Sequence, residues 1–213
     1  MKTDELIDLL GANVEPVKRG YMRTALLAAL AVGAAAAFCL RLAVYGVPAN
    51  PFSGEDVGLK VAGLALALSL VVVGGGFLIK SARPGEAGRG ALIIIGLLLL
   101  AIFSAGTIAL ALASPSAWSG MVFGPQWAAC FFCIPVFAAL PFATLVWALR
   151  KAAPTRLALT GAVIGLVAGA LGAAVCAYHY PSSSIPFLAF WYGGPIVLCG
   201  LIGALLGPRL LRW

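Results

Sequence analysis

Residues 91–113 read ALIIIGLLLLAIFSAGTIALALA, without one charged side chain. A helix needs about 20 such residues to cross the hydrocarbon core of a bilayer. The run does not alternate polar and apolar residues in short segments, as the strands of a membrane barrel do. Its many Ala and Leu residues favour helix. The segment therefore predicts a transmembrane helix.

Five further runs share this character, so six spans are expected. They are Thr24–Tyr45, Val57–Ile79, Ala91–Ala113, Trp127–Leu149, Leu157–Tyr178 and Phe187–Leu206. The whole chain of 213 residues is 62% hydrophobic and only 10% charged, whereas a soluble domain has about 25% charged residues. We therefore expect an all-α polytopic membrane protein embedded in the lipid bilayer: a six-helix transmembrane bundle over residues 23–213, preceded by a cytoplasmic segment over residues 1–22.

Positive charge collects in every second connection between the spans. Twelve of the 14 Lys and Arg residues lie there: Lys2, Lys18, Arg19, Arg23, Lys80, Arg83, Arg89, Arg150, Lys151, Arg156, Arg209 and Arg212. The alternate loops, near residues 46–56, 114–126 and 179–186, contain none. The positive-inside rule then predicts a bacterial inner-membrane protein with both termini in the cytoplasm. The two remaining cations, Arg41 and Lys60, lie near the outer ends of their helices and are expected to reach the headgroups.

Composition and spacing also exclude several classes of function. The basic residues form no patch interleaved with aromatics, so no direct binding of nucleic acid is expected. No catalytic triad, phosphate-binding loop or carboxylate pair is present, so neither an enzyme nor a cofactor is expected. Cys130-x-x-Cys133 alone is a weak metal signal. No carboxylate lies deep in a span, which disfavours an ion-coupled transporter; a transporter or lipid-handling protein remains an alternative, with Ser104, Thr107 and Thr144 lining a polar cavity.

Small residues and prolines predict how the helices pack. Glycines recur every four residues at Gly161, Gly165 and Gly169, and again at Gly203 and Gly207. Such spacing lets helix backbones approach closely, within the bundle, in a homo-oligomer or in a larger membrane assembly. Pro135, Pro141 and Pro195 should bend their helices, because proline removes a backbone donor.

The polar segment Met1–Gly20 contains a short amphipathic pattern. Thr3 is a suitable N-cap, and Asp4 and Glu5 stand in the first turn, where the helix dipole favours anions. Apolar residues follow beside Asp8, and Gly11 is a stop signal. The candidate partner-binding residues are Thr3, Asp4, Glu5, Leu6, Ile7, Asp8, Leu9 and Leu10. A helix this short needs a surface; its acidic edge suits a protein groove better than the membrane interface, where basic faces prevail.

Cysteines are the second set of candidates. Cys130 and Cys133 lie one turn apart near the outer end of the fourth span, and Cys176 lies near the outer end of the fifth. Antiparallel neighbours would bring Cys130 and Cys176 to the same depth, so a disulfide between them is conceivable if their Cα atoms come within about 7 Å. The alternative is structural, since cysteine packs well as a small apolar residue.

Several segments together resemble the NrsF-type anti-sigma-F factors of proteobacteria. They are Thr3-Asp4-Glu5-Leu6-Ile7-Asp8-Leu9-Leu10, Trp127-Ala128-Ala129-Cys130 with Ile134-Pro135, Ala153-Pro154-Thr155-Arg156, and the ending Trp191-Tyr192 … Gly207-Pro208-Arg209-Leu210-Leu211-Arg212-Trp213. The resemblance covers essentially the whole chain. It implies a protein that holds an extracytoplasmic-function (ECF), SigF-like sigma factor at the inner membrane and releases it under heavy-metal or oxidative stress.

The same resemblance assigns roles to residues. It implies that the N-terminal segment contacts the sigma factor and that Cys130 and Cys176 take part in redox or metal sensing. Cys130 matches the family's cysteine in the fourth span. After the fifth span the family has His-Cys-Pro, where this sequence has His179-Tyr180-Pro181. Cys176, one turn earlier, is the candidate replacement.

Overall fold

The computed structural model describes residues 20–46, 57–81, 89–124, 127–152, 154, 156–177 and 184–212. All six predicted spans are present as helices long and apolar enough to cross a membrane. The spans are α2 (Tyr21–Tyr45), α3 (Val57–Ser81), α4 (Arg89–Leu112), α6 (Trp127–Arg150), α7 (Leu157–Ala177), and a composite last span of α8 (Ile185–Leu188), η2 (Ala189–Gly193) and α9 (Gly194–Leu210). The short helices η1 (Pro115–Ala117) and α5 (Trp118–Val122) join α4 to α6. The expected helix over Thr3–Leu10 lies outside the described residues.

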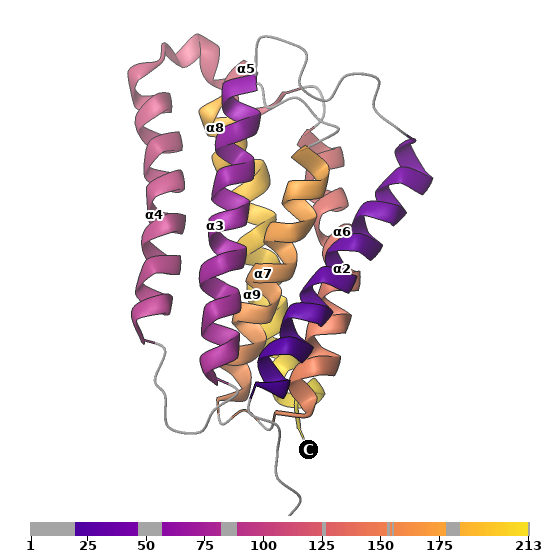
Figure 1. Ribbon diagram of the computed structural model, residues 1–213. Helices are drawn as coiled ribbons and strands as arrows, with labels where there is room; N and C mark the ends of the chain where they lie inside the picture. The colour runs from indigo at the N-terminus through magenta and orange to yellow at the C-terminus, as the bar shows by residue number, and fades with distance from the viewer. Residues whose placement is uncertain are drawn as a thin grey trace, which may run out of the picture.

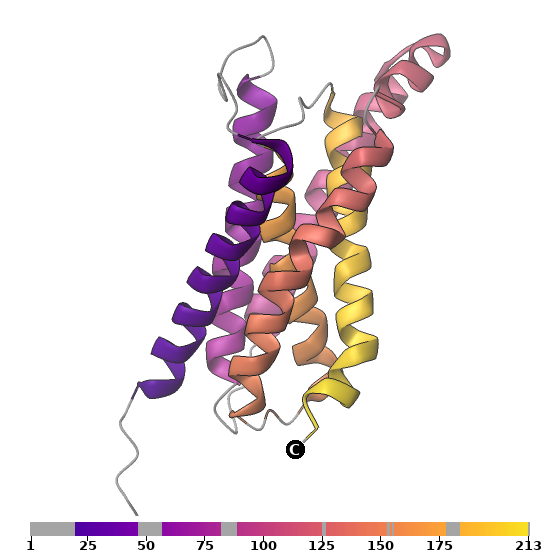
Figure 2. The ribbon, with the colours of Figure 1, turned by 90° about the vertical axis from the view of Figure 1, so that its right-hand side faces the viewer.

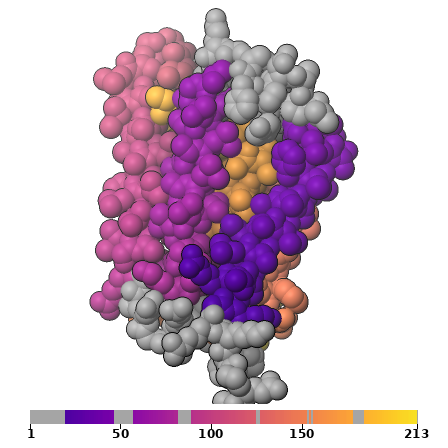
Figure 3. All heavy atoms as spheres, in the orientation of Figure 1, coloured from indigo at the N-terminus to yellow at the C-terminus, as the bar shows by residue number. Residues whose placement is uncertain are grey.

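Helix α7 is the centre of the bundle, with α3, α6 and α9 packed around it (Figure 1). In an 18-residue apolar stretch of α7, 78% of the residues are buried inside the structure, whereas in the corresponding stretch of α4 only 11% are buried. Small side chains make this position available, because α7 is built largely from Gly, Ala and Val. Helices α2 and α4 flank the core, and α2 packs mainly on α6. In Figure 3 part of α7 shows between α2 and α3, which diverge from one another along their length.

The glycines of α7 and α9 face each other inside the chain. A Cβ on Gly161 would meet the Gly203 carbonyl oxygen, and one on Gly165 would meet that of Cys199. A Cβ on Gly207 would lie 2.5 Å from the Leu157 carbonyl oxygen. The predicted close approach of helix backbones is therefore confirmed. Because these two faces cover one another within one chain, they are not open to a second copy, and the expected oligomer through them is corrected.

Prolines shape α6 and the last span. Pro135 and Pro141 lie inside α6, which bends between its two halves in Figure 2. Before Pro195, residues Ala189–Gly193 form a π-helical turn. Pro195 has no N–H with which to close a bond to the preceding turn, so the backbone there is free to adopt the wider winding.

The two ends of the bundle differ in chemistry. The basic end, where α2 begins and α9 ends (Figure 1), carries the described cations Arg23, Lys80, Arg89, Arg150, Lys151, Arg156, Arg209 and Arg212. There the Lys151 Nζ lies 4.2 Å from the centroid of the Trp147 ring. The opposite end, here called the aromatic end, gathers Phe123, Trp127, Phe131 and Trp191 in contact. Aromatic belts of this kind are typical of a membrane–water interface.

Hydrogen bonds attach the short helix α5 to the last span at the aromatic end. The Trp191 Nε1 donates to the Val122 carbonyl oxygen at 2.7 Å. The Ser184 hydroxyl donates to the Met121 carbonyl oxygen at 2.6 Å and accepts from the Phe187 N–H. Ser184 thus caps α8 and holds α5 at the same time.

Arg41 departs from the expectation. Its side chain is 1% exposed, so the prediction that it reaches the headgroups is wrong. The reason is its position on α2: the buried residues of that helix are Leu26, Ala29, Gly33, Ala37 and Arg41, and their spacing of three and four marks one face. Lys60 is half-buried.

Candidate functional site

Three cysteines meet at the aromatic end of the bundle. Helix α6 begins there and α7 ends there, so their antiparallel packing brings Cys130 and Cys133 to the level of Cys176. Cys130 is 0% exposed and Cys176 is 1% exposed, whereas Cys133 is partly accessible. We call Cys130, Cys133 and Cys176 the thiol cluster. The expectation that Cys130 and Cys176 share one depth agrees with this placement.

The pairing of Cys130 with Cys176 that the sequence suggests stays a prediction. Cys176 lies near both Cys133 and Cys130, and Cys130 lies near Tyr192. No disulfide joins any of the five cysteines.

Two tyrosines that sequence reasoning missed complete this site. The Tyr45 hydroxyl, at the end of α2, lies 2.9 Å from the Cys133 sulfur. The Tyr45 ring also meets the Phe137 ring edge-on, with centroids 6.2 Å apart. A tyrosine at the end of an apolar run needs a partner for its hydroxyl, and that requirement was the available signal.

A groove between α2 and α6 leads to the thiol cluster. Its volume is about 470 Å³, and it is lined by Leu40, Val44, Tyr45, Ala128, Ala129, Phe132, Cys133, Val136 and Phe137. The rim is apolar, since Phe132 is 68% exposed and Val44 and Val136 are similarly open. Such a rim offers an apolar surface around the partly accessible Cys133 thiol.

The thiol cluster is not arranged as a metal site. Among the residues that the structure describes, no three His, Cys, Asp or Glu side chains are grouped to hold a metal ion. His179 lies outside those residues.

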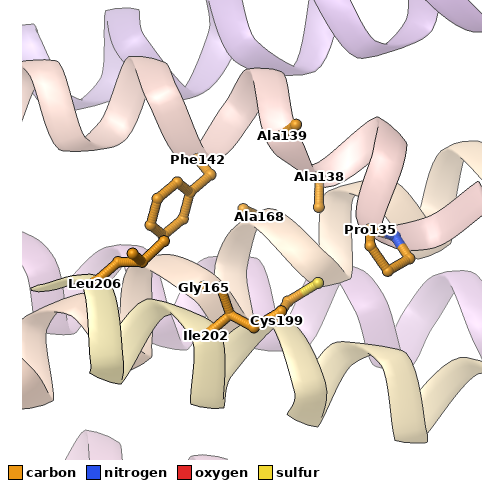
Figure 4. A pocket seen from close by; sticks show the side chains of 9 residues that line it. All are labelled: Pro135, Ala138, Ala139, Phe142, Gly165, Ala168, Cys199, Ile202 and Leu206. Atoms are coloured by element: carbon orange, nitrogen blue, oxygen red, sulfur yellow. The ribbon is translucent and has the colours of Figure 1, made fainter. Parts of the chain in front are cut away.

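A second hollow tests the alternative of a transporter. Figure 4 shows a crevice of about 180 Å³ between α6, α7 and α9, with Cys199 as its one polar side chain and Phe142 and Leu206 at one end. The hydroxyls of Ser104, Thr107 and Thr144 each donate to a carbonyl three residues earlier in their own helix. These three hydroxyls are thus bonded to their own helix backbones, and they give the transporter alternative no support.

The predicted partner-binding residues Thr3–Leu10 lie outside the described residues. The structure does describe the helix that follows them. Helix α2 begins at Tyr21, directly after Gly20, whose φ of 101° needs glycine. Only 22% of the residues in an 18-residue apolar stretch of α2 are buried inside the structure. The N-terminal segment is thus joined to a peripheral helix.

Comparisons with known proteins match the chain over its length. Residues 10–213 fit the family model NrsF, described as negative regulator of sigma F. The chain is 31% identical over 224 residues to a probable anti-sigma-F factor NrsF of Azospira oryzae, and 35% identical over 225 residues to the anti-sigma-F factor NrsF of Caulobacter vibrioides. Both alignments cover the whole of each chain. No solved structure matches. With a family model matched over nearly the whole chain and two relatives aligned from end to end, the chain belongs to the NrsF family of negative regulators of sigma F.

Proposed function

We propose that this chain retains a SigF-like ECF sigma factor at the bacterial inner membrane, with both of its own termini in the cytoplasm, and releases it on heavy-metal or oxidative stress. The family match over residues 10–213 supports retention and is the observation that carries the proposal. The finer points rest on chemistry. The cations of the basic end favour a cytoplasmic position for that end, which is also where residues 1–19 join α2.

The N-terminal segment is the proposed contact with the sigma factor. Residues Thr3–Leu10 combine an apolar stripe with acidic neighbours, which suits a protein groove with a basic rim. The basic end of the bundle itself is unsuited to an equally basic rim, because like charges repel. A segment of opposite sign, attached to a peripheral helix, is therefore the better candidate.

The proposed signal acts at the thiol cluster through Cys130 and Cys176. For release, the modified cluster must favour a state of the bundle that binds the sigma factor less well. A coupling free energy of about 1–3 kcal/mol would change the affinity by about 5- to 150-fold. That range suffices for a regulatory response.

Co-purification tests the retention. We expect the full-length chain, extracted in detergent, to bring down its candidate sigma factor, and a chain lacking residues 2–12 to lose it while keeping its yield and its elution volume. Equal recovery of the sigma factor by both chains would contradict the proposed contact. A reagent added from the periplasmic side that labels residues 1–19 would contradict the proposed topology.

The double change Cys130→Ser with Cys176→Ser tests the sensing. Serine keeps the size of cysteine but cannot be oxidised to a disulfide, so we expect a blunted response to cadmium or peroxide with basal repression unchanged. A sigma-dependent reporter measures both. Cys39→Ser, at an exposed position on α2, is the matched control and should respond as the natural protein does. A full response in the double variant would refute sensing through these cysteines.

A further inference from the structure

The crevice between α6, α7 and α9 (Figure 4) opens to the surface of the bundle, because Ile202 in its wall is 42% exposed. Its floor is formed by Gly165 and Ala168 of α7, whose side chains are too small to fill the space between the walls. Its walls are α6 and α9, which run in the same direction, since both end at the basic end. Phe142 and Leu206 continue the apolar surface toward that end.

Both walls of the crevice lead to cations. A helix with 3.6 residues per turn returns to nearly the same side after about 7 and about 11 residues. Arg209 therefore lies on the side of α9 that carries Ile202, and Arg150 lies on the side of α6 that carries Ala139. Both arginines are exposed, as is Arg156, which directly precedes α7. Each helix that lines the crevice thus has an arginine at the basic end.

The distance from the crevice to these cations matches one leaflet of a bilayer. At 1.5 Å per residue, Cys199 lies about 15 Å from Arg209 along α9, and Ala139 lies about 16 Å from Arg150 along α6. Half of a hydrocarbon core of about 30 Å is about 15 Å. A phospholipid whose phosphate lies at the two arginines therefore reaches the crevice with the end of an acyl chain.

Charge and volume define the occupant further. The part of the chain that the structure describes contains no Asp or Glu, so within it no carboxylate competes with a phosphate for Arg150 or Arg209. A guanidinium group binds phosphate oxygens through paired hydrogen bonds. The volume of about 180 Å³ is below the roughly 300–1,000 Å³ of pockets that enclose a whole small molecule. It accommodates part of an acyl chain, with the headgroup outside at the arginines.

We propose that this crevice is a binding site for one anionic phospholipid of the leaflet at the basic end, with an acyl chain in the crevice and the headgroup phosphate bound by Arg150 and Arg209. A zwitterionic lipid is the poorer ligand, because its own ammonium group competes with the arginines for the phosphate. Under the proposed topology the leaflet is the cytoplasmic one, but the site does not depend on that assignment.

The bound lipid joins two helices that otherwise pack mainly through a third. Helices α6 and α9 each contact α7 more extensively than they contact one another. A phosphate held by Arg150 and Arg209 therefore links the ends of α6 and α9 at the basic end.

Native mass spectrometry tests the headgroup. The full-length chain in detergent is given equal amounts of phosphatidylglycerol and phosphatidylcholine, and we expect it to retain one phosphatidylglycerol. Arg150→Gln with Arg209→Gln should weaken this retention about 30-fold, because each cation near the surface contributes about a fivefold change. Lys80→Gln with Arg89→Gln, which removes the same charge from α3 and α4 at the same end, is the matched control and should retain the lipid.

Three results of that measurement overturn the site. They are equal retention of the two lipids by the natural chain, an equal loss in the control variant, and a dimer in place of the lipid adduct that the arginine variant dissociates. The last result would assign the crevice to a second copy of the chain.

Photo-crosslinking tests the position of the acyl chain. A trace of phosphatidylglycerol with a diazirine near the end of one acyl chain is added to the full-length chain in phosphatidylcholine liposomes, and the linked peptides are identified by mass spectrometry. We expect links within residues 135–142 and 199–206 that are lost in Arg150→Gln with Arg209→Gln. The same distribution of links from a phosphatidylcholine probe, or links mainly to α4, overturns the proposal. Both measurements omit the sigma factor, so their failure is distinct from a failure of retention, which co-purification reports.

Discussion

Replacing Gly165 by leucine is expected to prevent α7 and α9 from packing. A Cβ at this position would meet the Cys199 carbonyl oxygen and lie 3.0 Å from the Gly200 Cα, so the obstruction is backbone and cannot rotate away. Overpacking a core commonly costs about 1–3 kcal/mol, and a whole leucine against backbone should exceed about 3 kcal/mol. We expect a lower midpoint of thermal unfolding in detergent and early labelling of the buried Cys199 thiol.

Gly96→Leu supplies the matched control for that change. Gly96 lies on the exposed side of α4, where an added Cβ meets nothing within 4 Å. The same increase in volume and hydropathy should leave the unfolding midpoint close to that of the natural chain. Equal midpoints for Gly165→Leu and Gly96→Leu would show that the contact between α7 and α9 does not limit stability.

The six spans could be predicted because the bilayer imposes a length and a polarity on each of them. The contact between α7 and α9 was also accessible, since glycines four residues apart allow close packing whatever the neighbour is. Which helix would be that neighbour was not accessible. Gly161 and Gly203 are 42 positions apart, and nothing local says that they meet rather than face another chain.

Positions at the helix surface were harder to predict. Arg41 was expected at the headgroups because it stands near a helix end, but the register of α2 against α6 places it on the buried face with Ala37. In a helix that is apolar all round, hydropathy alone does not say which face is covered.

The candidate site was predicted in part. Sequence reasoning brought Cys130 and Cys176 to one depth, which antiparallel helices require. The choice between Cys130 and Cys133 as the neighbour of Cys176 depends on the rotation of α6, and the contact with Tyr45 depends on how α2 crosses it. Both the rotation of α6 and the crossing of α2 over it are set by tertiary packing, which the local sequence does not specify.

Combining Leu6→Ala with Leu10→Ala is expected to release the sigma factor without stress. The two positions lie one turn apart on the predicted N-terminal helix, and alanine keeps its helix propensity. If each leucine buries its side chain in the partner, truncation of both costs about 2–4 kcal/mol, which is about a 30- to 1000-fold weaker affinity. The dissociation constant of the purified complex and a sigma-dependent reporter should both show it.

The acidic neighbours provide the control that identifies the source of this affinity. Asp4→Asn with Glu5→Gln removes charge and leaves the apolar stripe, so we expect a slower association that depends less on salt and a small loss of affinity. Should the charge variant prove the more damaging of the two, the contact would be mainly electrostatic. An unchanged affinity in the leucine variant, with loss of binding to liposomes, would place the segment on the membrane instead. The apolar stripe predicts that the leucine variant loses more affinity than the charge variant, because burial against a partner is what compensates for exposing four large aliphatic side chains on so short a helix.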